Sequence, residues 1–224
     1  MTQQTTPEFV LVIPRTELEA QGIDFSGIQK IDLEKFNPEN FGFLPRALID
    51  NKSDTSIEIG KLLPQVLPYF IIKDKDGRVL SYNRQGKEDG LLGKNSIGVG
   101  GHIDLTDSLI QQNEVNILNG WGLYLTNICA VMFEGLTREL KEEIGLHVCK
   151  MPEFDFIIAI DTDKTSNVHV GFVATIHVES FDELTPNPEE FLEVKYLTFE
   201  ELLQRSKEVE YEPWSQLIID HYNT

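Results

Sequence analysis

The segment Arg138-Glu-Leu-Lys-Glu-Glu-Ile-Gly-Leu146 constrains the fold more than any other part of this 224-residue chain. Apolar residues at helical spacing lead into it and continue through it: Val131, Leu136, Leu140 and Ile144. This period predicts a helix over residues 129–144 with one buried stripe. Gly145 follows directly and is a typical C-terminal stop for a helix. The segment therefore predicts an amphipathic helix that docks one face on a core.

The other side of this helix carries three glutamates. Residues three and four apart share a helix face, so Glu139 lies beside Glu142 and Glu143. Like charges at that spacing repel each other by about 0.2–0.5 kcal/mol per exposed pair. A hard divalent cation removes this conflict, and Mg²⁺ prefers carboxylate and water oxygens. A second interpretation stays open: a solvated acidic face partly balanced by Arg138 and Lys141.

The charge of the chain excludes several classes of partner. It has 37 Asp and Glu against 19 Lys and Arg, a formal net charge of −18. Such a surface repels nucleic-acid polymers and anionic membranes, since binding a polyanion needs basic side chains. A small phosphorylated substrate remains compatible, because a bound cation inverts the local field. Two cysteines, no signal-peptide pattern and no membrane-spanning run lead us to expect a cytoplasmic protein.

The rest of the chain predicts strands mixed with helices. The strand segments expected C-terminal to Pro68 are 69–73, 79–83, 96–101, 154–160, 168–178 and 191–197. Helices are expected over residues 198–206 and 214–222. Residues 22–60 show a weak pattern, and we expect irregular structure there with a short helix near 44–49. Strands and helices without strict alternation predict an α/β (α+β) fold with a mixed sheet and helices on its faces.

Three glycines connect the acidic helix to a known sequence pattern. Gly98, Gly100 and Gly101 follow a predicted strand and precede the helix. Together they resemble the box of the Nudix hydrolase family: Gly, five residues, Glu, seven residues, then Arg-Glu-apolar-any-Glu-Glu-any-Gly-apolar. Residues 138–146 agree with the second half at every specified position, and Gly100-Gly101 is similar to the glycine pair that opens the box.

The first half of the box departs from the family pattern. Asp107 stands six residues after Gly101, where the family has glutamate, and Ala130 stands eight residues before Arg138. The offset between positions 107 and 130 implies an insertion of about 23 residues, which a loop tolerates because closure entropy grows slowly with length. Asp107 or Glu114 fills the acidic position, or nothing does.

The resemblance implies a domain organisation. It covers residues 68–224, and we expect a Nudix domain over 61–224 with the insertion at about 108–130. Residues 1–60 are expected to form an N-terminal extension packed on that domain. The Ser96-Ile-Gly-Val-Gly-Gly-His-Ile103 string also resembles a branch of the family described as predicted phosphoesterases.

The resemblance implies roles for the box residues. Glu142 and Glu143 would be metal ligands, with the Gly100 carbonyl as a further one, and Glu139 a ligand or the general base. Arg138 would orient the carboxylates through charge-assisted hydrogen bonds. A further acid is expected from the loop before the last strand, where Glu190 is preferred over Glu189 and Glu193; each also reads as a solvated loop carboxylate.

Substrate contacts are expected from Arg84, Gly101 and His102. Arg84 reads equally as a solvated loop arginine. His169 and His177 are expected in sheet packing, and no zinc-ligand cluster is visible. Aromatic residues Trp121, Tyr124 and Trp214 suit either stacking on a base or filling the core, with the core favoured.

These expectations together describe a Nudix-type α/β/α sandwich that hydrolyses a diphosphate linkage. The expected substrate is a small molecule, a nucleoside diphosphate linked to another moiety, and the cofactor is Mg²⁺, with Mn²⁺ as a possible substitute. One alternative is a catalytically inactive binding or regulatory module on the same fold. Another is an isomerase acting on an isoprenoid diphosphate, which lacks support because Cys129 and Cys149 flank the helix rather than a site. A homodimer is expected from family habit.

Overall fold

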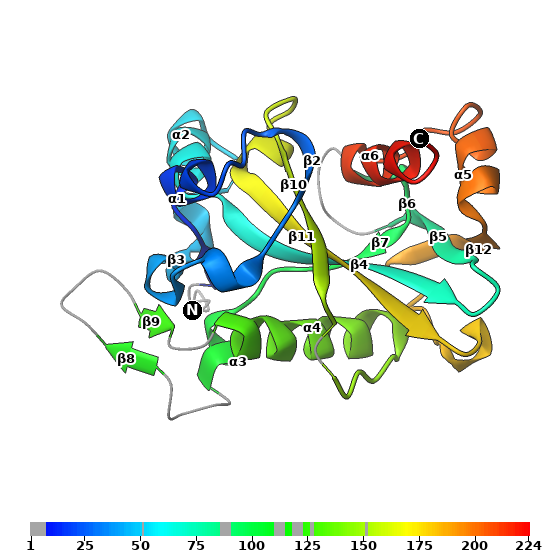
Figure 1. Cartoon of the computed structure of the whole chain (residues 1–224), viewed down its shortest axis with the longest axis horizontal. Helices are drawn as coiled ribbons and strands as arrows, with labels where there is room; N and C mark the ends of the chain where they lie inside the picture. Colours follow the sequence, from blue (N-terminus) through cyan, green and yellow to red (C-terminus); the bar gives the residue numbers. More distant parts are fainter. Residues whose placement is uncertain are drawn as a thin grey trace, which may run out of the picture.

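The computed structural model of the chain describes residues 8–50, 52–85, 91–109, 115–117, 123–125, 128–150 and 152–224. Ten strands of this part form one mixed sheet, and helices cover both of its faces (Figure 1). The sheet order is β12 (Phe191–Leu197), β5 (Val79–Arg84), β4 (Gln65–Asp74), β11 (His169–Val178), β10 (Phe154–Ile160) and β2 (Ser26–Lys30). Attached to this path are β1 (Phe9–Val12), β3 (Gly42–Pro45), β6 (Asn95–Ser96) and β7 (Gly98–Val99).

The helices and the remaining strands complete the described elements. The helices are α1 (Arg15–Ala20), α2 (Asp54–Leu62), α3 (Leu105–Leu109), α4 (Ile128–Ile144), α5 (Phe199–Arg205) and α6 (Pro213–His221). Strands β8 (Val115–Ile117) and β9 (Leu123–Leu125) pair with each other outside the main sheet. Short 3-10 turns lie at Leu33–Lys35, Pro38–Asn40, Arg46–Leu48, Ser166–Val168 and Phe181–Glu183. None of the helices among the described residues is long and apolar enough to cross a membrane.

The centre of the sheet is the parallel pair β4 and β11. Their register runs from Gln65 opposite His169 to Asp74 opposite Val178, while β10 pairs antiparallel with both β11 and β2. Side chains alternate between the faces of a strand, so β4 feeds two cores. Phe70 and Ile72 pack with the apolar stripe of α4, and Tyr69 and Ile71 pack with α6.

The acidic helix forms as its sequence predicts. Helix α4 spans Ile128–Ile144 and buries Leu136, Leu140 and Ile144 completely. Gly145 ends it with a φ of 70°, a left-handed conformation that only glycine adopts at little cost. Figure 1 shows α4 on one side of the sheet and α5 and α6 on the other. The predicted α/β/α sandwich with a mixed sheet is confirmed.

The first sixty residues are more regular than expected. Strand β2 pairs with β10 at the edge of the sheet. Strand β1 joins the sheet by pairing with β4, where Val12 lies opposite Gln65. In place of a helix at 44–49, the chain has the end of β3 and the 3-10 turn Arg46–Leu48, and α2 follows. The Ser53 capping box starts α2. The division into an extension and a domain beginning at residue 61 stays a prediction.

The proposed insertion is described only in part. Helix α3 begins at Leu105, before the expected boundary at 108, and the pair β8 and β9 lies within the insertion. Glu114, Trp121 and the remaining connections fall outside the described residues.

Candidate active site

Helix α4 holds the three predicted carboxylates at different depths below the surface. The Glu139 side chain is 14% exposed, that of Glu142 is 63% exposed, and Glu143 is half-buried. Because Glu139 lies under other side chains while Glu142 lies in solvent, the three carboxylates do not form a uniform solvated face.

Arg138 ties the inner part of this face together. Its Nε and Nη2 donate to the two carboxylate oxygens of Asp107 at 2.9 and 3.0 Å, and its Nη1 donates to Glu139 Oε1 at 2.7 Å. Nη2 also donates to the His102 carbonyl at 2.9 Å. Hydrogen bonding to Asp107, against the opposing effect of burial, raises the pKa of Arg138, so the guanidinium stays charged.

Asp107 is a partner of Arg138 in this structure. Its side chain is only 2% exposed, and one of its oxygens also accepts the backbone N–H of Asp104 at 2.8 Å. With all its observed contacts directed at Arg138 and the α3 N-terminus, Asp107 orients Arg138, which in turn holds Glu139. Of the two residues considered for the first acidic position of the box, Asp107 is placed beside the box helix, and Glu114 lies outside the described residues.

The glycine pair fits closely between the sheet and this helix. A Cβ on Gly101 would lie 2.3 Å from Cδ of Glu139, and a Cβ on Gly100 would lie 2.1 Å from the Pro68 carbonyl oxygen. No real side chain tolerates such distances. Gly100 therefore requires glycine, because backbone atoms block a Cβ there, whereas a Cβ on Gly101 would displace the end of the Glu139 side chain.

The glutamates of α4 offer carboxylate oxygens, which are the type of ligand that a hard divalent cation prefers. Burial raises the pKa of Glu139, and the charge of Arg138 opposes this only in part, since Arg138 also serves Asp107. The outer carboxylate, Glu142, lies 3.6 Å from Arg138 and is exposed. The described residues hold no preformed group of three or more His, Cys, Asp or Glu side chains around a metal position. The chemistry of the oxygens suits Mg²⁺, but metal ligation by Glu139, Glu142, Glu143 and Gly100 stays a prediction.

Two of the three acidic candidates, Glu189 and Glu190, are exposed in the loop before β12, whereas Glu193 lies within β12. The Asn187 N–H donates to the Glu143 carbonyl at 2.8 Å, and the Gln85 N–H donates to the Glu190 carbonyl at 2.9 Å. These bonds hold the loop of the exposed Glu190 between the end of α4 and the end of β5. Glu193 instead forms ion pairs with Lys195 and Arg205, at 3.7 and 3.9 Å, on the side of α5.

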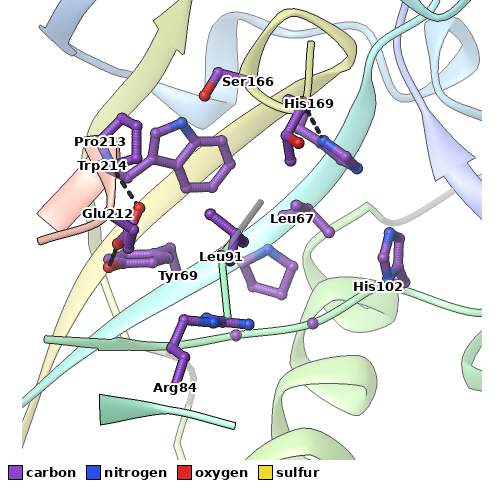
Figure 2. Close-up of a pocket in the computed structure, with 14 residues that line it drawn as sticks. Leu67, Tyr69, Arg84, Leu91, His102, Ser166, His169, Glu212, Pro213 and Trp214 are labelled. Atoms are coloured by element: carbon purple, nitrogen blue, oxygen red, sulfur yellow. Dashed lines mark hydrogen bonds between the residues drawn. The ribbon is translucent and has the colours of Figure 1, made fainter. Parts of the chain in front are cut away.

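A pocket of about 670 Å³, open mouth included, adjoins this face. Four of the predicted residues line it: Arg84, Gly100, Gly101 and His102. Figure 2 shows Arg84 and His102 at the edge of the pocket, with Trp214 and Pro213 across the opening from them. The sequence thus predicted residues that the fold brings to one cavity, whereas their contact with substrate stays a prediction.

Sequence reasoning missed Tyr69 and Glu212 in the far wall of the pocket, whereas it considered Trp214 for base stacking or the core and favoured the core. Tyr69, Glu212 and Trp214 line this wall, and the Tyr69 hydroxyl donates to Glu212 Oε1 at 2.5 Å. Glu212 also caps α6 by accepting the N–H groups of Trp214 and Ser215, each at 2.9 Å. An available signal was Glu212 directly before Pro213, since an acidic residue followed by proline is typical of a helix start.

His102 and His169 lie together at the other end of the pocket. Their ring centroids are 5.8 Å apart, and His169 Nδ1 lies 2.6 Å from the Thr165 carbonyl oxygen. A carbonyl only accepts, so His169 carries a proton on Nδ1. Burial, followed by the nearby charge of Arg46, lowers the pKa of His102 well below its usual range, so this imidazole is neutral near pH 7.

Comparison with known proteins bears on the fold. The sequence matches no family model and no curated protein. Among solved structures, Tm1382, a candidate Nudix hydrolase, superposes with a TM-score of 0.67 and 22% identity, over 96% of this chain and 98% of that one. DR0079 from Deinococcus radiodurans gives 0.48 and 13% over 86% and 97%, and the MutT protein from Methanosarcina mazei Go1 gives 0.44 and 17% over 71% and 94%. The chain therefore has the fold of the Nudix hydrolases.

Proposed function

We propose that this chain is a Mg²⁺-dependent pyrophosphohydrolase that cleaves the diphosphate linkage of a nucleoside diphosphate joined to another moiety. The observation that carries the proposal is the Arg138 network, which holds the Glu139 carboxylate against Gly101, a residue that also lines the neighbouring pocket. The Nudix fold and the intact Arg138 to Leu146 string support it.

The residues of the chain divide the work of hydrolysis. Bound Mg²⁺ would polarise the phosphoryl group and lower the pKa of the attacking water. Glu139 is suited to accept the proton of that water, because burial raises its pKa and Arg138 fixes its position. Water attacks one phosphorus, the bridging P–O bond breaks, and two phosphorylated fragments leave.

Arg84 supplies positive charge on the pocket side. It lines the cavity with Gly100 and Gly101, at the end of β5. Glu190 is proposed as a further metal ligand, because its loop is bonded to the end of α4 through Asn187 and Glu143. A cytoplasmic location, a homodimer and use of Mn²⁺ in place of Mg²⁺ belong to the same proposal.

Replacement of Glu142 by glutamine tests the proposal. Since 63% of this side chain is exposed, the substitution leaves the fold intact while removing one proposed ligand charge. We expect turnover of the best substrate from a panel of nucleotide diphosphate esters to fall at least about 100-fold, with the melting temperature unchanged. Glu200→Gln on α5, an exposed glutamate on the opposite face of the sheet, removes the same charge and serves as the matched control.

The same assay addresses the inactive binding module. An inactive module predicts no product with any substrate and no heat of Mg²⁺ binding in calorimetry. Turnover of Glu142→Gln equal to that of the wild type would overturn the assignment of this glutamate.

A further inference from the structure

The chain changes its pairing partner just before the glycine segment, Gly100 and Gly101. Strand β6 pairs with β5, whereas β7, which follows it, pairs with β4. Ile97 stands between these two short strands, so its amide lies at the crossover from one partner to the other. The glycine segment follows β7 directly, and Gly101 lies against the Glu139 carboxylate. The position of the glycine segment therefore depends on what holds this crossover.

Ser215 of α6 binds the crossover amide. The Ile97 N–H donates to Ser215 Oγ at 2.9 Å, and both residues are 0% exposed. The Gly98 carbonyl, next along the chain, accepts the Tyr82 hydroxyl at 2.8 Å and the Ser96 hydroxyl at 3.1 Å. Helix α6 lies on the face of the sheet opposite α4 (Figure 1). The backbone leading to the glycine segment is thus held by buried hydrogen bonds from the side away from the acidic helix.

Glu212 fixes the direction of the hydrogen bonds made by Ser215. A carboxylate only accepts, and Ser215 Oγ donates its single proton to Glu212 Oε1 at 2.5 Å. The Tyr69 hydroxyl donates to the same oxygen, also at 2.5 Å. With its proton directed at Glu212, Ser215 Oγ presents lone pairs to the Ile97 N–H. The network therefore has one consistent arrangement of protons, in which Ser215 is the acceptor for the crossover.

Tyr69 supports the next residue from the same side. A Cβ on Gly98 would overlap the Tyr69 ring, so the ring packs directly against the bare backbone. The hydroxyl of this ring belongs to the Glu212 network. Three residues further on, Gly101 meets the Glu139 carboxylate with no room for a side chain. The short stretch between them is packed on both sides, so a shift at the crossover is passed on to the glycine segment.

We propose that Ser215 is a positioning residue of the active site, which sets the place of the glycine segment against Glu139 by binding the Ile97 N–H. The proposal rests on the proposed function for the Gly100 carbonyl as a metal ligand. In Ser215→Ala the buried Ile97 N–H loses its acceptor, and the backbone must move to satisfy it. Groups that orient metal ligands from outside typically change metal affinity or activity by about 10–100-fold when they are removed.

Backbone amide signals of the metal-free protein test the positioning without catalysis. In ¹H–¹⁵N spectra recorded in EDTA, we expect Ser215→Ala to shift the signals of Gly100 and Gly101 as well as that of Ile97. Glu212→Gln leaves Ser215 in place but disturbs the acceptor of its hydroxyl proton, and should move the same three signals. This second variant tests the network even where Ser215→Ala fails to fold.

Metal binding and kinetics test the consequence for the site. Calorimetry with Mg²⁺ alone should show about tenfold weaker binding to Ser215→Ala than to the wild type. Turnover per folded molecule, measured well below the melting temperature, should show kcat about tenfold lower with KM unchanged, because the pocket walls keep their side chains. A serine that only stabilised the fold would lower the melting temperature and leave both quantities as they are.

Ser56→Ala is the matched control. Like Ser215, Ser56 is a buried serine at the third position of its helix, and its hydroxyl bonds Ser53 in the capping box of α2. It should lose stability through its cap and keep the Gly100 and Gly101 signals, the Mg²⁺ affinity and the kcat of the wild type.

Four outcomes separate the proposals. Unchanged Gly100 and Gly101 signals in both network variants would overturn the inference, as would equal shifts of these signals in Ser56→Ala. Unchanged Mg²⁺ affinity and kcat in Ser215→Ala, beside a wild type that hydrolyses its substrate, would refute only the positioning role. Shifted signals and weaker Mg²⁺ binding without turnover of any substrate would refute only the proposed hydrolysis.

Discussion

The glycine segment, Gly100 and Gly101, separates two different environments, one beside α4 and one beside α6. On the α4 side, ionised groups are paired, with Arg138 between Asp107 and Glu139 and with Glu142 in solvent. On the α6 side, the polar groups are enclosed among apolar walls around Glu212. Because Gly100 and Gly101 have no side chains, these two environments approach to within the thickness of one backbone. The α4 side is suited to adjust around a cation, and the α6 side is rigid before anything binds.

The largest expected effect is a loss of kcat when a methyl group is added to the glycine segment at Gly101. In Gly101→Ala the new methyl group would occupy the place of the Glu139 carboxylate, whose flexible end must then move away from Arg138. Because only the end of a side chain shifts, we expect the free energy of unfolding to change by less than about 1 kcal/mol. Displacement of a catalytic group by about 1 Å costs about 100-fold, so kcat should fall by that factor.

Gly42→Ala is the matched control for this substitution. Nothing lies within 4 Å of a Cβ built on Gly42, so the added methyl group meets open space. Kinetics and urea unfolding of both variants separate a local effect on Glu139 from a general effect of alanine. Full turnover in Gly101→Ala would show that the position of Glu139 against this glycine is not needed.

A smaller effect, on the free energy of unfolding, is expected when the buried ion pair between Asp107 and Arg138 is removed. Asp107 is 2% exposed and Arg138 is 28% exposed, so Asp107→Asn leaves a partly buried guanidinium without its main counter-charge. Loss of one partner of a fully buried pair costs about 3–5 kcal/mol, and the partial exposure of Arg138 reduces this to about 2 kcal/mol. Urea denaturation measures the change.

An exposed ion pair provides the comparison for Asp107. Asp161 pairs with Arg15 at 2.8 Å, but its side chain is 46% exposed. Asp161→Asn should therefore cost no more than about 0.5 kcal/mol. Similar losses in the two variants would contradict the view that burial makes the Arg138 network important for stability.

The sequence pattern predicted the bounds of several helices and strands, but not which strands pair with each other. Helix α4 and strands β10 and β12 have bounds within a residue of those predicted. The helix has a clear apolar period, and each of the two strands is a run rich in apolar residues. Strand β2 was missed: its five residues carry little pattern, and it is held by pairing with β10, more than a hundred residues away.

The candidate site divides in the same way. The acidic string was visible because residues 138–146 are contiguous and match the second half of the box, and the glycine pair because it follows a predicted strand. His102 and Arg84 gather at the same pocket. Asp107 meets Arg138 across 31 residues, and Glu212 meets Tyr69 across 143. Such contacts depend on how distant elements pack, so no local spacing indicates them. Trp214 was expected in the core, and it is both buried and part of the pocket wall.

The smallest expected effect concerns His102 on the pocket side of the glycine segment, and it is a pH dependence of the free energy of unfolding. Because burial lowers the pKa of His102 below its value in the unfolded chain, the unfolded state binds more protons between these two values. Stability from this group is therefore complete above about pH 6.5 and is lost as the pH falls, by at most about 1.4 kcal/mol per pH unit. The raised pKa of Glu139 has the opposite effect on stability at lower pH. The informative quantity is therefore the difference in the free energy of unfolding between the wild type and His102→Gln.

That difference should shrink as the pH is lowered from 7 to 5 in urea-unfolding series of the two proteins. It shrinks because the variant has no buried imidazole that must be protonated on unfolding. His147→Gln, which replaces an exposed histidine beyond the end of α4, should keep the wild-type slope. A constant difference in the free energy of unfolding between wild type and His102→Gln would mean that His102 has the same pKa in the folded and unfolded protein. His102 would then take up a proton in the folded protein at the pH where a free imidazole does, and burial would not keep the pocket side of the glycine segment free of that charge.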